Sequence, residues 1–264
     1  MPVQKPQPLI EITQLCKSFG GNTAVAGVDF EMKKGEIVGL VGPNGAGKST
    51  IFNLITGYLL PDRGAVVFNG DRITGLRPDQ IAQKGVGRTF QLTLLFHGQT
   101  VLDSLFAGHV REEKTGFWHA LFNTRAYQME RKRAFEKSLE VLEFMELTGW
   151  KDTVVNVLPC GIQRFLGIAQ AIMSPVDILL LDEPLTGLNE EEISGLLDKL
   201  QRLRAQGVSI LVIEHHMKAV MALCDRIVVL NFGIKIAEGT PDEIGRHPAV
   251  IEAYLGRRRG VRAS

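Results

Sequence analysis

Residues 42–50 read GPNGAGKST and combine the residue types that a phosphate-binding loop needs. They fit the pattern G-x-x-x-x-G-K-[ST], directly after the apolar run EIVGLV and before the helical pattern TIFNLITG. Glycines let successive backbone N–H groups point at phosphate oxygens, and the start of the following helix adds partial positive charge. In this pattern Lys48 reaches the β and γ phosphates and Ser49 binds Mg²⁺. The predicted nucleotide-binding residues are Gly42, Pro43, Asn44, Gly45, Ala46, Gly47, Lys48, Ser49 and Thr50.

A second group of residues with useful chemistry follows two apolar runs later in the chain. In ILLLDEP the run delivers Asp182 and Glu183 to the end of a predicted strand, where ligands bind in open α/β sheets. Because side chains alternate along a strand, Asp182 is predicted to bind Mg²⁺ while Glu183 faces the attacking water as general base. His215 follows VSILVIE and either hydrogen-bonds a γ-phosphate or is an ordinary polar residue. The neighbouring His216 leaves both interpretations open.

The elements that must position these residues form an α/β core. EIVGLV, DILLLDEP, VSILVIEHH and DRIVVLNFG are compact apolar runs separated by helical patterns, which is typical of buried parallel strands. Residues 1–91 and 158–256 are predicted to contain this nucleotide-binding core. The N-terminal part adds an antiparallel β subdomain, in which Asn69-Gly70 marks a hairpin.

Strand signals fade between residues 92 and 157, and helical signals replace them. Thr100 and Asp103 in TVLDSL have the spacing of a capping box. The segment RAFEKSLEVLEFMELTG predicts a helix that stops at Gly149. Its apolar residues at helical spacing are Phe135, Leu139, Leu142 and Met145. We therefore predict an inserted α-helical subdomain over 92–157, and a flexible basic tail over 257–264.

The composition argues against several classes of function. The 264 residues include 30 basic and 29 acidic side chains, a net charge of +1, so no global positive field would hold nucleic acid. Cys16, Cys160 and Cys224 are odd in number and far apart, which is typical of reduced cytosolic thiols. Runs of about 18 apolar residues are absent from the sequence, so we expect that the chain does not cross a bilayer alone. A role at a membrane would then require docking on other subunits.

The order of these motifs resembles an ATP-binding subunit of an ABC transporter over about residues 9–256. The resemblance implies a single ABC ATPase domain over 1–256, with a RecA-like P-loop NTPase core. It also implies that Phe19 in KSFGG stacks on adenine, that Gln91 in RTFQ is the Q-loop glutamine, and that His215 is the switch histidine. The implied catalytic set is Glu183, His215 and Gln91, and the implied Mg²⁺ ligands are Ser49, Gln91 and Asp182.

Within that family the sequence is most similar to the branched-chain amino acid importers, a group that includes urea and amide importers. The supporting phrases are GVGRTFQ, TVLDSL, KTGFWHALFNT, VIEHHMKAVMALCDRIVVLNFG and GTPDEIGRHPAVIEAYLG. The resemblance implies an ATPase that energises uptake of branched-chain amino acids or a related small polar solute, with ATP and Mg²⁺ as cofactors. Its location would be peripheral, on the cytoplasmic face of the inner or plasma membrane.

The resemblance also implies partners. A second, non-identical ATP-binding subunit would complete a head-to-tail dimer. Two membrane permease subunits would dock on the Gln91 loop and on the helical subdomain. A periplasmic or extracellular solute-binding protein would act indirectly through those membrane subunits. Nucleic acid is not among the expected partners.

Residues 158–164, LPCGIQR, stand where the family usually has LSGGQ, the signature segment that binds the partner's ATP. Pro159 replaces the serine and Ile162 the glutamine, whereas Gly161 is kept. Losing one charged hydrogen bond to phosphate typically costs about 1.5–3 kcal/mol, so we expect a weakened rather than an inactive site. The residues expected to face the partner's ATP are Leu158, Pro159, Cys160, Gly161, Ile162 and Gln163.

The sequence leaves other functions open. ABC-type ATPases of translation or repair usually carry two such domains with a charged linker, or a long coiled coil, and this sequence has neither. A P-loop kinase or GTPase would not need Gln91, the signature segment and His215 together. A regulatory subunit that binds ATP but hydrolyses it poorly is consistent with the altered signature segment.

Overall fold

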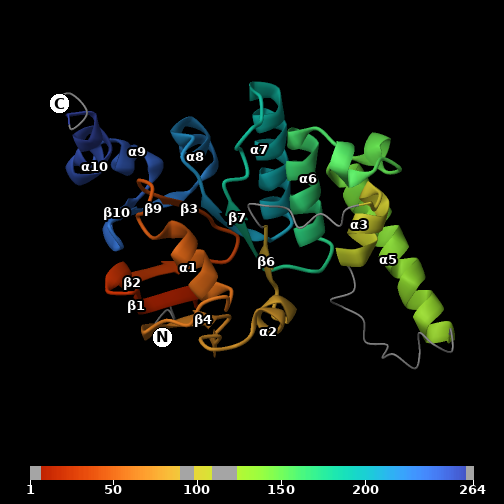
Figure 1. Ribbon diagram of the computed structural model, residues 1–264, viewed down its shortest axis with the longest axis horizontal. Coiled ribbons are helices and arrows are strands. Elements are labelled where there is room, and N and C mark those ends of the chain that lie inside the picture. Colours follow the sequence, from red (N-terminus) through yellow and green to blue (C-terminus); the bar gives the residue numbers. More distant parts are fainter. Residues whose placement is uncertain (1–6, 90–97, 109–123, 260–264) are drawn as a thin grey trace, which may run out of the picture.

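The computed structural model describes residues 7–89, 98–108 and 124–259, which form a core of two sheets with helices around it (Figure 1). Within these ranges, the larger sheet has the strand order β10-β9-β3-β8-β7-β6, and all neighbours are parallel except β10 with β9. Its strands are β3 Ile37–Val41, β6 Val86–Arg88, β7 Ile178–Asp182, β8 Ser209–Ile213, β9 Arg226–Asn231 and β10 Ile234–Gly239. The four apolar runs of the sequence all form strands of this sheet, so the predicted parallel α/β core is confirmed.

The N-terminal region forms a second, antiparallel sheet, as predicted. Its strand order is β2-β1-β4-β5. The strands are β1 Ile10–Phe19, β2 Asn22–Met32, β4 Arg63–Phe68 and β5 Asp71–Arg72. Asn69 and Gly70 link the last two strands with φ values of 50° and 82°. Positive φ at both residues is the turn geometry that Asn-Gly favours between antiparallel strands, so the predicted hairpin is confirmed.

Helices pack against both faces of the parallel sheet (Figure 1). The described α-helices are α1 Lys48–Ile55, α2 Pro78–Gln83, α3 Val101–Gly108, α5 Arg125–Phe144, α6 Cys160–Ala171, α7 Glu190–Ala205, α8 Met217–Leu223, α9 Pro241–Gly245 and α10 Pro248–Arg259. Two short 3₁₀ helices span Thr148–Trp150 and Val155–Val157. None of the helices in the described ranges is long and apolar enough to cross a membrane.

The parallel sheet separates two apolar cores. Along β7, Ile178 and Leu180 pack with α1 and the antiparallel sheet, whereas Leu179 and Leu181 pack with α6, α7 and α8 on the other face. This alternation follows from the two-residue period of a strand. The side chain of Asp182, the next residue in the series of Ile178 and Leu180, is therefore expected on the face that carries α1.

The helical region differs from its prediction in one helix end. The capping box is confirmed, because the Asp103 N–H donates to Thr100 Oγ1 at 3.1 Å and the Thr100 N–H to Asp103 Oδ2 at 3.4 Å. The predicted stop at Gly149 is wrong, since α5 ends at Phe144. Glu146 takes a left-handed φ of 58°, which a right-handed helix cannot continue.

The apolar stripe of α5 is only partly buried. Leu142 is fully buried, but Phe135 and Leu139 are exposed to 45% and 40%. The subdomain boundaries at 92 and 157 stay a prediction, and residues 92–97 and 109–123 within them lie outside the described part of the chain.

Candidate nucleotide-binding site

The phosphate loop joins β3 to α1, and neighbouring strands enclose its backbone. Gly47 is the N-cap of α1 with a φ of 99°, and a Cβ atom there would lie 2.4 Å from the carbonyl oxygen of Ala24 in β2. A Cβ atom on Gly42 would lie 2.2 Å from the carbonyl oxygen of Leu230 in β9. Only glycine fits such approaches, so the sequence pattern fixes the loop against two strands. The backbone N–H groups at the start of α1 are thereby placed for an anion.

Lys48, the first residue of α1, lies folded over this loop. Its side chain is buried, and its Nζ donates to the carbonyl oxygens of Gly42 at 2.8 Å and Pro43 at 3.1 Å. Burial lowers the pKa of Lys48, while the nearby Glu183 and Asp182 carboxylates act in the opposite direction. A phosphate oxygen is a stronger acceptor for an ammonium group than a neutral carbonyl. The lysine is thus positioned to exchange these contacts for a phosphate.

Asp182 is a buried carboxylate at the end of β7. Its Oδ2 lies 3.7 Å from Nη2 of Arg88, and its Oδ1 is buried without a hydrogen-bond partner. Burial raises the pKa of Asp182, and the Arg88 charge acts against that rise. A buried carboxylate oxygen without a donor is costly, and a cation at the site would remove that cost. The donor set therefore fits Mg²⁺, which binds carboxylates and phosphate oxygens.

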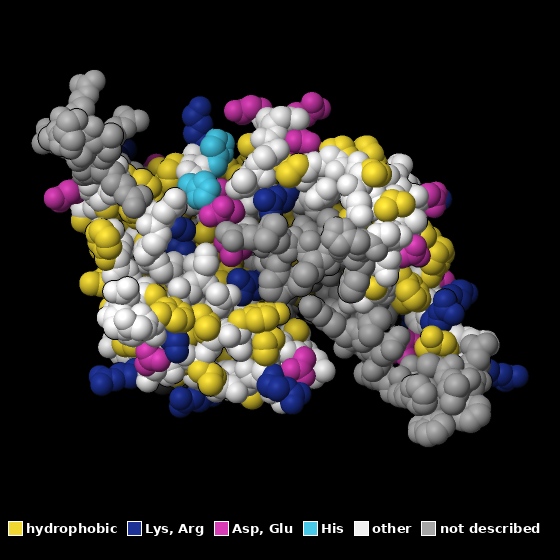
Figure 2. All heavy atoms as spheres, in the orientation of Figure 1, with side chains coloured by type: hydrophobic (Ala, Val, Ile, Leu, Met, Phe, Trp, Pro, Cys, Tyr) yellow, Lys and Arg dark blue, Asp and Glu magenta, His cyan; other side chains and the backbone are white. Residues whose placement is uncertain are grey.

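Glu183 and His215 meet at the ends of two adjacent parallel strands, β7 and β8. Glu183 Oε2 lies 3.5 Å from His215 Nε2, and both side chains are partly open to solvent. Glu183 has a left-handed φ of 52°, and its N–H donates to the carbonyl oxygen of Ile213 at 2.9 Å. A non-glycine residue in this conformation is uncommon and often functional. Figure 2 shows histidine side chains beside acidic ones on one face of the molecule.

The remaining predicted ligands differ in how far they can be placed. Ser49 is exposed at the start of α1, and Thr50 beside it is partly buried. Phe19 ends β1 with 46% of its surface exposed, and Nζ of Lys17 lies 5.6 Å from the centre of its ring. One face of this aromatic ring is therefore near a cation, in a position that suits a cation–π contact. Gln91 lies outside the described residues.

The signature segment forms the start of α6. Pro159 is the N-cap, Cys160 is the first helical residue, and the side chain of Pro159 provides no cap. Gln163 donates from Nε2 to the carbonyl oxygen of Leu158 at 2.9 Å, so its amide is engaged within its own chain. The Gln163 N–H makes the first helical bond, to the Pro159 carbonyl oxygen at 3.0 Å, so residues 160–162 keep N–H groups without a helical acceptor, and Pro159 lacks the fourth such donor.

Gly161 is the one signature residue that permits a close approach. A Cβ atom there would lie 2.4 Å from Oε1 of Glu192 on α7. Glu192 is itself held in a capping box, where its Oε2 accepts from the Asn189 N–H at 2.9 Å and its N–H donates to Asn189 Oδ1 at 2.9 Å. The start of α6 therefore lies against the end of the Glu192 side chain at the start of α7.

Comparison with known proteins identifies the family. The family model "ABC transporter" matches residues 25–186, more than half of the chain and all of the phosphate loop together with Asp182 and Glu183. The chain belongs to the ABC transporter family. A second model, "Branched-chain amino acid ATP-binding cassette transporter", matches residues 235–259, which contain most of β10 and all of α9 and α10. The chain is thus an ATPase whose activity is coupled to transport, and ATP is its nucleotide.

Several curated relatives and solved structures resemble this ABC transporter chain over most of its length. The high-affinity branched-chain amino acid transport ATP-binding protein BraF of Pseudomonas aeruginosa is 41% identical over 95% of this chain and 98% of its own. The protein LivG of Escherichia coli, with the same description, is 40% identical over the same shares. The nucleotide-free structure of an ATP-binding cassette from an ABC transporter is 30% identical, with a TM-score of 0.83 over 95% of this chain and 100% of that one. An ADP conformation of an ATP-binding cassette is also 30% identical, with a TM-score of 0.82, over 95% and 99%.

Two charged residues near the site were missed from the sequence. Arg88 follows an apolar residue in the three-residue strand β6, and donates from Nη1 to Asn53 Oδ1 at 2.7 Å and Thr56 Oγ1 at 2.8 Å. Glu214 directly precedes His215 and is 3% exposed. For Glu214 the available signal was a charge at the end of an apolar run, whereas Arg88 follows only Val86 and Gly87 and has no such run before it. The role of each of these two residues depends on which strands are neighbours in the sheet, and the local sequence does not show that pairing.

Proposed function

We propose that this ABC transporter chain is the ATP-hydrolysing subunit of an importer for branched-chain amino acids or a related small polar solute. The match of residues 235–259 to the branched-chain amino acid transporter model carries this proposal. The relatives that are about 40% identical over 95% of the chain support it, because their printed descriptions name branched-chain amino acid transport.

In this proposal the residues of the site divide the work of hydrolysis. Lys48 binds the β and γ phosphates, and backbone N–H groups of the phosphate loop hold the phosphate oxygens. Glu183 takes a proton from the attacking water, and His215, with its Nε2 3.5 Å from Glu183 Oε2, orients that water and the γ-phosphate. Phe19 stacks on adenine. The role of Gln91 in catalysis and metal binding stays a prediction.

Mg²⁺ is the proposed metal, and Ser49 and Asp182 are its proposed ligands, with Gln91 as the third. When bound, the ion would neutralise charge on the β and γ phosphates. The unpartnered Oδ1 of Asp182 supports this assignment. In this proposal the ion depends on phosphate oxygens as well as on these side chains.

We further propose a head-to-tail dimer with a second, non-identical ATP-binding subunit. In that arrangement the signature segment, residues 158–163, faces the ATP held by the partner. The exposed Pro159 and Cys160 at the start of α6 support an intermolecular role. Two membrane permease subunits would hold the dimer on the cytoplasmic face of the membrane, and a solute-binding protein outside would deliver the solute.

Reconstitution tests the proposed solute. The chain, co-purified with its membrane subunits, would be placed in lipid vesicles and supplied with the solute-binding protein. ATP hydrolysis and uptake are expected to rise when leucine, isoleucine or valine is added. If only urea or an amide stimulates hydrolysis and uptake, the proposed solute would be wrong, and the proposed ATPase role would stand. A solute-independent ATPase without any uptake would contradict the importer.

A further inference from the structure

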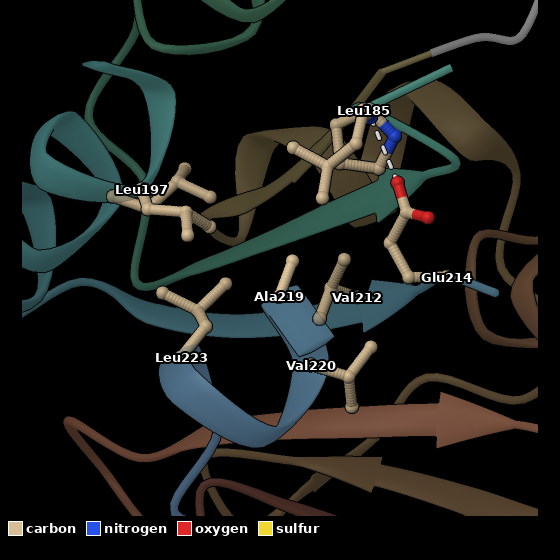
Figure 3. A pocket seen from close by; sticks show the side chains of 9 residues that line it. Leu185, Leu197, Val212, Glu214, Ala219, Val220 and Leu223 are labelled. Atoms are coloured by element: carbon tan, nitrogen blue, oxygen red, sulfur yellow. Dashed lines mark hydrogen bonds between the residues drawn. The ribbon is translucent and has the colours of Figure 1, made fainter. Parts of the chain in front are cut away.

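A second buried carboxylate, Glu214, lies directly after β8 on the face of the sheet opposite to the phosphate loop. It shares that face with Ile210 and Val212, which belong to the core around α7 and α8. Glu214 is 3% exposed and lines a cavity of about 10 Å³ whose other walls are apolar (Figure 3). Placing a carboxylate in such surroundings is costly unless donors satisfy both of its oxygens.

Three backbone N–H groups converge on this carboxylate. The N–H of Leu185 donates to Oε1 at 2.7 Å, the contact drawn as a dashed line in Figure 3. The N–H groups of His215 and His216 donate to Oε2 at 3.1 Å and 3.4 Å. One oxygen therefore holds the segment after β7, and the other holds the segment after β8. The carboxylate therefore links the segments that follow β7 and β8, at positions beyond the last hydrogen bonds between these two strands.

The residues proposed to act on water lie at these two segments. Glu183 is two positions before Leu185, and its N–H donates to the carbonyl oxygen of Ile213, the residue before Glu214. The turn that carries Glu183 is thus held at both of its ends by residues 213 and 214. His215 is held through its own backbone N–H by the same carboxylate.

We propose that Glu214 is a positioning residue for ATP hydrolysis, which fixes Glu183 and His215 relative to each other without contacting the nucleotide. The proposal rests on the catalytic roles proposed above for those two residues. According to this proposal, Glu214 maintains the distance of 3.5 Å between Glu183 Oε2 and His215 Nε2. An apolar residue would fill the site without the cost of a buried charge, but it would leave all three N–H groups without an acceptor.

Glu214→Gln tests this role with almost no change in shape. Glutamine offers one acceptor and one donor group, so its NH₂ must face backbone N–H groups on one of the two sides. We expect kcat of the assembled complex to fall about 10- to 100-fold, because a displacement of about 1 Å at a catalytic group costs about that much. The KM for ATP is expected to change less than about threefold, because Lys48 and the phosphate loop lie on the other face of the sheet.

Leu223→Ala is the matched control, since Leu223 lines the same cavity without touching the carboxylate or the phosphate loop (Figure 3). It enlarges the cavity and is expected to lower the melting temperature, while kcat below that temperature stays within about twofold of the unmodified complex. A Leu223→Ala variant that is folded and loses kcat as much as Glu214→Gln would overturn the proposal, because packing alone would then explain the loss.

A double-mutant cycle separates this proposal from the proposed function. If Glu214 acts through Glu183, adding Glu214→Gln to Glu183→Gln should cost little further in single-turnover hydrolysis. If the rate loss of the double variant equals the product of the losses of the two single variants, the positioning role would be overturned. Normal turnover of Glu183→Gln alone would instead refute the proposed base.

Glu214→Asp keeps the test decisive should Glu214→Gln fail to fold. The shorter carboxylate can reach the N–H groups of His215 and His216 next to it, but not that of Leu185 as well. We expect kcat to fall about tenfold with the KM for ATP retained. An unchanged kcat in either folded variant would overturn the proposal.

Discussion

The phosphate loop and the signature segment both place backbone N–H groups at the start of a helix, but only the loop is enclosed by its own chain. Strand β2 lies close against Gly47 and strand β9 close against Gly42, and the side chain of Lys48 is buried over the loop. At the signature segment Pro159 and Cys160 are exposed. This difference supports the proposal that the chain provides the enclosed half of a composite site, the phosphate loop, and presents the other half, the signature segment, to a partner.

Glu183→Gln should have the largest effect and should act on the enclosed half. The change keeps the shape of the side chain and removes the proposed base, so we expect kcat to fall at least about 100-fold. ATP binding is expected to persist, and an ATP-bound dimer with the second ATP-binding subunit should accumulate on size-exclusion chromatography when both subunits are present. Glu136→Gln, an exposed carboxylate on α5, is the control and should turn over normally. Normal turnover of Glu183→Gln would show that the enclosed half works with another base.

Gly161→Ala should break the signature half while leaving the enclosed half intact. The added methyl group would lie 2.4 Å from Glu192 Oε1, so the end of the Glu192 side chain must move away, and the start of α6 would present a methyl group where glycine leaves its backbone open. We expect ATPase activity of the assembled complex to fall about tenfold or more, with ATP binding by the isolated subunit unchanged. Nucleotide titrations of the isolated subunit measure ATP binding, and steady-state rates of the complex measure ATPase activity.

Gly195→Ala is the matched control for that variant. Gly195 also lies in α7, where an added Cβ would meet no atom within 4 Å. Alanine in a helix interior is more stable than glycine by about 0.5–1 kcal/mol, so the melting temperature should rise and the ATPase should not change. Equal ATPase activity of Gly161→Ala and Gly195→Ala would contradict a role of the start of α6 in the composite site.

Thiol labelling should report the covering of the signature segment. Cys160 is exposed, whereas Cys224 is buried and its pKa is raised to about 12, chiefly by that burial. A maleimide should therefore modify Cys160 and spare Cys224 in the folded protein, since the thiolate is the reactive form. In the Glu183→Gln variant, ATP should slow the reaction of Cys160 about tenfold by closing the dimer over it. A rate that does not depend on ATP would argue against that closure.

Pro159→Ser should have the smallest effect, and it should strengthen the weaker half. A serine hydroxyl restores one donor to phosphate, worth about 1.5 kcal/mol at the lower end of the range for such bonds, so the ATPase activity of the complex should rise about tenfold. Serine at an N-cap also stabilises α6. Pro159→Asp controls for this, because it caps the helix but repels phosphate and should raise the melting temperature without raising activity. Equal gains in both variants would attribute the effect to helix stability.

Local sequence patterns predicted the phosphate loop because its chemistry depends on adjacent residues. The same holds for the hairpin at Asn69-Gly70 and the capping box at Thr100. Contacts between segments distant in the sequence could not be found in this way. Glu214 acquires its proposed role from the pairing of β7 with β8, and Arg88 from the pairing of β6 with β7. The early end of α5 depends on the backbone angle at Glu146, and glutamate itself gives no signal for that angle.

The two carbonyl contacts of Lys48 also concern the end of each turnover. When phosphate departs, a buried ammonium group would be left without an acceptor in most pockets, and product would stay bound to avoid that loss. Here the oxygens of Gly42 and Pro43 lie 2.8 Å and 3.1 Å from Nζ and can accept its hydrogen bonds again. In the proposed mechanism these two carbonyl oxygens would replace phosphate as acceptors for Lys48, which would favour release of the product before the next ATP binds.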